Sequence, residues 1–81
     1  MFELRIIDLS KLKFENLYKH SFKLQPNQGD WIEIDIEGVG VAFEVVKIIH
    51  SSKGHGSDIY VRRVGSTPEA LKSLVRLNDN L

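Results

Sequence analysis

The chain has 81 residues, of which 42% are hydrophobic and 27% charged, and its 11 Lys and Arg balance 11 Asp and Glu. This length fits one folded domain over residues 1–81, and the composition is that of a globular rather than a disordered protein. The zero formal charge excludes a global field that would attract nucleic acid or anionic membranes, and the absence of cysteine excludes disulfides, thiolate catalysis and Cys-ligated zinc.

The first residues, MFELRIID, lack the basic start and the long apolar run of a signal peptide. No apolar stretch approaches the roughly 20 residues that a membrane-spanning helix needs. We therefore expect a soluble, cytoplasmic protein that has no membrane partner.

The first elements in chain order are a strand and an ambiguous segment. Residues 2–9 are rich in Ile and Leu and predict a strand. Residues 10–24 fit either a short helix or a second hairpin, and the alternation of Tyr18, His20, Phe22 and Leu24 favours a strand at about 20–24. A turn is expected over 25–30, where Pro26 sets φ and Gly29 adopts a conformation that other residues resist.

The clearest strand follows this turn, because apolar and polar residues alternate strictly from residue 31 to residue 37. One face carries Ile32, Ile34 and Ile36, and the other carries Trp31, Glu33, Asp35 and Glu37. A hairpin through residues 38–40 leads into a more apolar, central strand over 41–50. With residues 38 and 39 as the turn, Ile36 would face Val41 and Glu33 would face Glu44. Such a pair of like charges needs a neutralising base, for which Arg62 on the next strand is the candidate.

The C-terminal third predicts a loop, a strand and a helix. Residues 51–57 have the glycines and serines of an exposed loop, and residues 59–64 form the partner strand. A helix over 68–78 begins either with Thr67 as the cap before Pro68 or with a capping box from Ser66 to Glu69. The apolar stripe of this helix is expected to pack on the sheet; it consists of Ala70, Leu71, Leu74, Val75 and Leu77.

These elements predict a mainly β (α+β) fold, either a small antiparallel meander or a partly open barrel, with a C-terminal helix. The order Pro26, Gly29, Asp30, Ile32 and Ile34, followed by a tight hairpin and two strands, resembles the entry to small SH3-like barrels over residues 25–64. Such barrels bind RNA, DNA, peptides or other subunits. The resemblance therefore implies a binding module without a particular ligand or residue role.

Residues with catalytic or metal-binding chemistry are sparse. His50 and His55 flank a glycine-rich loop near Asp58, and Ser51 and Ser52 follow His50, but neither spacing matches an established metal or serine-nucleophile motif. The Glu33 and Glu44 carboxylates are expected on an open face, where pKa values shift little. No phosphate-binding loop occurs. We expect no enzyme, no metal and no cofactor.

Binding of a protein partner, or of a second copy, is the favoured interpretation. Trp31 offers an exposed aromatic surface for it. Residues 2–9 are expected at a sheet edge, where Ile6 and Ile7 would join two copies into an antiparallel homodimer.

The alternative interpretation is binding of RNA or single-stranded nucleic acid. Residues 30–46 contain five acids and no Lys or Arg, whereas residues 47–63 contain four bases and one acid. In this alternative the basic hairpin contacts phosphates and an aromatic ring stacks on a base. The residues for this role are Lys47, Lys53, Tyr60, Arg62 and Arg63.

Overall fold

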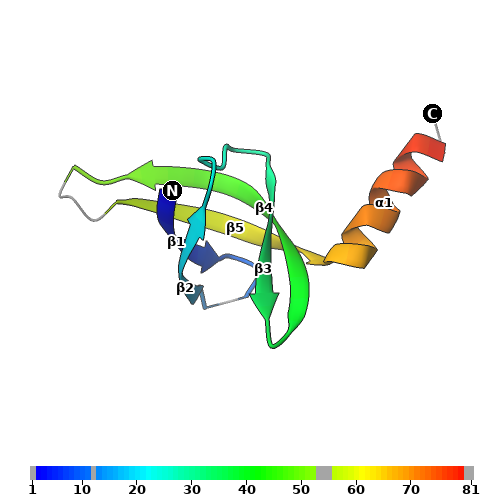
Figure 1. The fold of residues 1–81 in the computed structure, drawn as a ribbon, viewed down its shortest axis with the longest axis horizontal. Helices are drawn as coiled ribbons and strands as arrows, with labels where there is room; N and C mark the ends of the chain where they lie inside the picture. Colours follow the sequence, from blue (N-terminus) through cyan, green and yellow to red (C-terminus); the bar gives the residue numbers. More distant parts are fainter. Residues whose placement is uncertain (1, 12, 53–55, 80–81) are drawn as a thin grey trace.

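The computed structural model describes residues 2–11, 13–52 and 56–79. Its elements are β1 (Phe2–Asp8), β2 (Glu15–Phe22), β3 (Trp31–Ile36), β4 (Val39–His50), β5 (Ser57–Ser66) and α1 (Thr67–Asp79). The five strands form one curled sheet in the order β2-β1-β5-β4-β3, which makes a half-barrel (Figure 1). The predicted mainly β, partly open barrel with a C-terminal helix is confirmed.

The hydrophobic core fills the concave side of the curled sheet, because alternate residues of β1, β3, β4 and β5 point inward. Phe43 and Val45 of β4 and Ile59 and Val61 of β5 are almost completely buried. Leu4 and Ile6, Ile32 and Ile34, and Val41 complete the buried cluster. Strand β2 adds only partly buried side chains, Leu17 and Phe22.

Strand β1 lies inside the sheet, so its expected edge position is wrong. It pairs antiparallel with β2 on one side and parallel with β5 on the other, where Ile6 is opposite Ile59. The sheet is therefore mixed rather than a pure antiparallel meander. The Ile- and Leu-rich sequence of β1 suits a strand with neighbours on both sides.

The β3–β4 hairpin has the expected faces but another register. Ile34 is opposite Val41 and Ile36 is opposite Val39, because the turn is made by Glu37 and Gly38 rather than by residues 38 and 39. Both turn residues have positive φ, 54° and 82°, as the commonest two-residue hairpin turn requires. The register differs by two residues, an even number, so each Ile keeps its side of the sheet.

The corrected register separates the two acids that were expected to face each other. Glu33 is opposite Ala42, and Glu44 is opposite Trp31. On its other side Glu44 is opposite Arg62 of β5, as predicted. Trp31, Glu44 and Arg62 therefore form a row across three strands on the convex face of the sheet.

Strand β2, within residues 10–24, forms the second arm of a hairpin with β1, which decides between the two alternatives. Strand β2 starts at Glu15, earlier than the expected 20–24. Its pairing with β1 shifts between Arg5 and Ile7, and Tyr18 at this irregularity has φ of 66°, which is rare for a bulky residue.

Helix α1 begins where predicted and extends away from the sheet (Figure 1). Ser66 Oγ accepts a hydrogen bond from the Glu69 backbone N–H at 3.4 Å, so Ser66 is the cap. Only Ala70 of the described apolar stripe is buried, which contradicts the expectation that the whole stripe packs on the sheet. Within the described ranges, no helix has the length and apolar character needed to cross a membrane.

Candidate functional site

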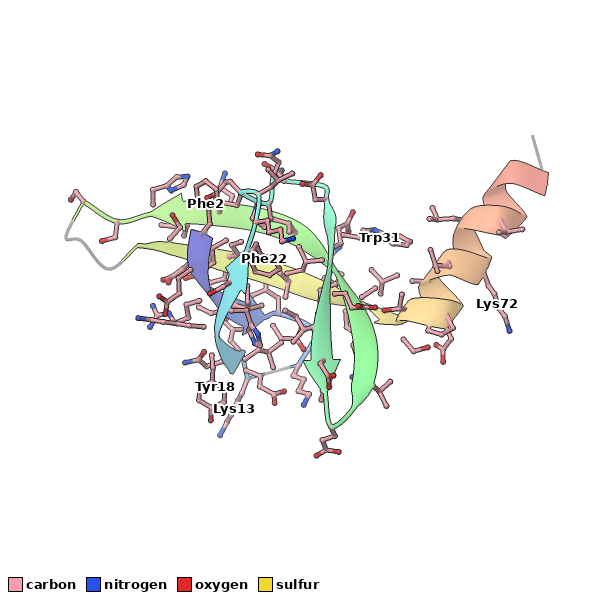
Figure 2. All side chains as sticks on the ribbon, in the orientation of Figure 1. Phe2, Lys13, Tyr18, Phe22, Trp31 and Lys72 are labelled. Carbon is pink, nitrogen blue, oxygen red and sulfur yellow. The ribbon has the colours of Figure 1, made fainter. Side chains whose placement is uncertain are left out.

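A groove runs between the first turn of α1 and the convex side of the β3–β4 hairpin. Its volume is about 200 Å³. It is lined by Trp31, Ile32, Glu33, Ala42, Thr67, Ala70 and Leu71. The two small residues, Ala42 and Ala70, are buried and allow helix and sheet to approach closely. Trp31 projects from β3 toward α1 (Figure 2) and is 38% exposed, so it forms one wall of the groove.

The groove continues into an uncovered apolar face of α1. Leu71, Leu74 and Val75 are 54%, 42% and 58% exposed. Spacings of three and four residues place them on one side of the helix. Together with Trp31 they form what we call the α1–Trp31 surface. Contiguous exposed apolar surface of this kind marks interaction sites in soluble proteins.

Glu33 connects the sheet to the start of the helix at this surface. Its Oε2 accepts a hydrogen bond from the Thr67 hydroxyl. The carboxylate lies over Gly40, where an added Cβ would come within 2.7 Å of Oε2. The charge of Glu33 is therefore held at a defined place beside the groove.

A second hollow of about 400 Å³ lies on the other side of Trp31, between β3 and the segment that follows β2. Leu24 in its lining is 81% exposed. The Gln25 side-chain Nε2 is buried there without a hydrogen-bond partner among the described residues. Trp31 thus stands between two hollows.

The mouth of the half-barrel forms a separate cleft of about 490 Å³ between β2 and β3. Its floor includes Ile34 and Phe43, and its rim carries both acids and bases. Lys11 at this rim pairs with Glu15, whose hydrogen bond and charge raise the pKa of Lys11. The cleft also contains the Arg63 side chain, which points to the concave side.

The residues predicted for nucleic-acid binding are divided between the two faces of the sheet. Lys47 is opposite Tyr60, and Arg62 lies two residues along β5 on the same convex face. Arg63 lies on the other face, at the cleft between β2 and β3. Lys53 lies outside the described residues. Three of the five predicted residues share one surface.

The two residues predicted to join two copies, Ile6 and Ile7, also lie on opposite faces of the sheet. Ile6 is fully buried in the core, so it is not available to a partner. Ile7 lies on the convex face opposite Tyr60 of β5. Since β1 also has a neighbour on each side, the expected pairing of two β1 strands is excluded.

The far end of the β4–β5 hairpin carries the residues considered for catalysis or metal binding. Arg5 holds Asp58 through two hydrogen bonds of 3.0 and 2.7 Å, and this contact raises the pKa of Arg5. His50 Nδ1 and Ser57 Oγ share a hydrogen bond of 2.6 Å. His55 lies outside the described residues. The described part of the chain contains no cluster of three potential metal ligands.

Comparison with known protein families, with curated proteins and with solved structures finds no match to this chain. The role of the site must therefore be inferred from its geometry. Sequence reasoning identified Trp31 but assigned Leu71, Leu74 and Val75 to the core. The available signal was the width of the apolar stripe, which shows that a helix face needs covering but not what covers it.

Proposed function

We propose that the chain is a non-enzymatic interaction module that binds a protein partner, or a second copy of itself, through the α1–Trp31 surface. The observation that carries this proposal is the uncovered apolar face of α1. Among the described side chains of the helix only Ala70 is buried, and Thr67 adds a hydrogen bond to Glu33 of the sheet.

Helix physics supports a covering partner. Isolated helices shorter than about 12–15 residues are marginal in water, and most helical stability in proteins comes from packing of the apolar face. Helix α1 has 13 residues and leaves Leu71, Leu74 and Val75 exposed. A partner that covers these side chains would stabilise the helix and bury the Trp31 ring, an aromatic type enriched at protein interfaces.

The fold agrees with this role at a general level. The curled sheet has the loose likeness to SH3-like barrels noted above, and such barrels act as binding modules. The groove beside Trp31 holds one anchoring side chain at most, since its volume is about 200 Å³. This size suits recognition of a protein side chain better than enclosure of a whole substrate, for which pockets of about 300–1,000 Å³ are usual.

Affinity capture with matched variants tests the proposal. The immobilised chain is compared with the double variant Leu71→Asp, Leu74→Asp and with a control, Phe14→Asp, which changes another exposed apolar residue, directly before β2 (67% exposed). We expect wild type and control either to capture a protein in stoichiometric amount from cells that produce the chain, or to form a self-complex detected by sedimentation. The double variant should do neither.

Two results would overturn the proposal. One is a chain that captures no protein and stays monomeric at about 100 μM, well above the micromolar range of weak association. The other is retention of nucleic acid that weakens steeply with salt and is lost in Lys47→Ala and Arg62→Ala variants, which would establish the convex face of β4 and β5 as the site.

A further inference from the structure

Strand β3 is an outermost strand of the half-barrel, as β2 is at the other end (Figure 1), so one backbone edge of β3 has no neighbouring strand. In a two-residue hairpin the residues that flank the turn exchange hydrogen bonds, and so does every second pair beyond them. The even-numbered residues of β3 therefore bond to β4. Val45 N–H donates to Asp30 C=O at 2.8 Å, which continues this alternation. The N–H and C=O groups of Trp31, Glu33 and Asp35 consequently point to the free edge.

Two of the hollows described above follow this edge, one after the other. The hollow of about 400 Å³ contacts residues 31–33, and the cleft of about 490 Å³ contacts residues 34–36. Neighbouring residues of a strand point to opposite faces, so a hollow that contacts consecutive residues lies at the edge of the strand. The opposite walls include residues of β2 and of the segment that follows it. Together the two hollows form what we call the β2–β3 trough.

Strand β2 does not close this trough. In the described sheet it pairs with β1 alone, and its own side chains occupy backbone groups at its irregular segment. The Tyr18 N–H donates to Asn16 Oδ1 at 2.8 Å, and His20 Nε2 donates to the Leu17 C=O at 2.8 Å. Backbone groups bonded in this way are not available to a neighbouring strand. The regular free edge beside the trough is therefore that of β3.

A second copy of β3 is a poor occupant of the trough. Two copies related by a two-fold axis would run antiparallel, with residues of the same face opposite each other. The registers with the longest overlap place Glu33 opposite Glu33 or Asp35 of the other copy. Like charges directly opposite each other are destabilising, so this symmetric pairing is disfavoured.

We propose that the β2–β3 trough binds an extended segment of another protein, which pairs with β3 as an added strand. The backbone of this segment bonds the free N–H and C=O groups of Trp31, Glu33 and Asp35. Its alternate side chains are apolar, because they point into the cleft whose floor includes Ile34 and Phe43. In strand addition, backbone bonds give affinity and alternate side chains give selectivity. This backbone edge is distinct from the side chains of the α1–Trp31 surface, so the contact is additional to the proposed function.

Amide hydrogen exchange measured by NMR tests the free edge and its occupation. In the chain alone we expect the N–H groups of Trp31, Glu33 and Asp35 to exchange fast and those of Ile32 and Ile34 slowly. The probe is a synthetic peptide of about seven residues in which valine alternates with threonine between lysine ends. At about 1 mM it should slow exchange at the edge positions by about tenfold.

Two N-methylated versions of the peptide separate strand addition from adherence to an apolar surface. One carries a methyl group on the central valine nitrogen and the other on a neighbouring threonine nitrogen, so each lacks a donor on a different backbone edge. Since one edge of the peptide faces β3, we expect one version to protect the β3 amides and the other to lose this effect. Equal action by both versions, or no protection by the unmodified peptide, would overturn the proposal.

Asp35→Pro and Asp35→Ala form a matched pair in the chain itself. Both lose the hydrogen bond that Asp35 Oδ1 accepts from the Gly38 N–H, but proline also removes the N–H of residue 35 from the edge. We expect Asp35→Ala to bind the peptide and Asp35→Pro to lose binding, with protection in β4 and β5 unchanged in both variants. The N-methylated peptides leave the chain unchanged, so they decide the question independently of any effect of proline on folding.

Failure of this inference is distinguishable from failure of the proposed function. The double variant Leu71→Asp, Leu74→Asp should bind the peptide like wild type, because its substitutions lie outside the trough. Equal binding by Asp35→Pro and Asp35→Ala overturns the added strand. A chain that dimerises by itself and protects the β3 edge amides overturns it in favour of a second copy.

Discussion

The curled sheet and helix α1 use apolar residues in opposite ways. In the sheet, side chains such as Phe43 and Val61 are 1% and 0% exposed and have neighbours from several strands. In α1, Leu71 and Val75 are more than half exposed, although their pattern is as regular. The comparison teaches that a regular apolar pattern on a helix does not by itself mean that the face is buried within the chain.

The largest expected effect is in the sheet. Phe43→Ala removes a fully buried ring from the centre of the core, and we expect the free energy of unfolding to fall by roughly 3–5 kcal/mol. Urea denaturation followed by circular dichroism measures this change. A loss below about 1 kcal/mol would mean that the core is not centred on β4.

An intermediate effect is expected at the junction between the two regions. Thr67→Val removes the hydroxyl that donates to Glu33 and keeps the side-chain shape, and we expect a loss of about 1 kcal/mol. Hydrogen exchange should show faster opening of α1 and unchanged protection in β4 and β5. Equal loosening of both regions would show that helix and sheet unfold as one unit, contrary to the comparison.

The smallest effect on stability is expected on the open face of the helix. Leu74→Ser changes a side chain that is 42% exposed, so the free energy of unfolding of the isolated chain should change by less than about 0.5 kcal/mol. Thermal unfolding of wild type and variant provides the measurement. A loss comparable to that of Phe43→Ala would place Leu74 in a packed core, and the difference between sheet and helix would disappear.

Much of the fold followed from local patterns. The alternation from Trp31 to Ile36 identified both the strand and its buried face, and the residues around Thr67 marked the start of the helix. The hairpin register was wrong because the glycines at 38 and 40 allow two turns, and the chain accepts Glu37 at a positive φ of 54°. Alternation has a period of two, so it could not distinguish these registers.

What could not be predicted was non-local. The sequence of β1 carries no record of which strands flank it, and its parallel partner β5 begins almost fifty residues later. Alternation along the predicted strand already separates Arg62 from Arg63, whereas the position of Arg62 opposite Glu44 depends on the pairing of β5 with β4. At the candidate site, Trp31 stood out by its chemistry, whereas its proximity to Leu71 depends on how the helix leaves the sheet.

The position of β1 also constrains the order in which the chain can fold. During synthesis, β1 and β2 emerge first and can form their hairpin, but the parallel partner of β1 is complete only after residue 61. The β3–β4–β5 meander has short connections and can form by itself, whereas docking of β1 closes a long loop at an entropic cost. The nascent N-terminal hairpin therefore carries the apolar face of Leu4 and Ile6 uncovered until most of the domain has been made.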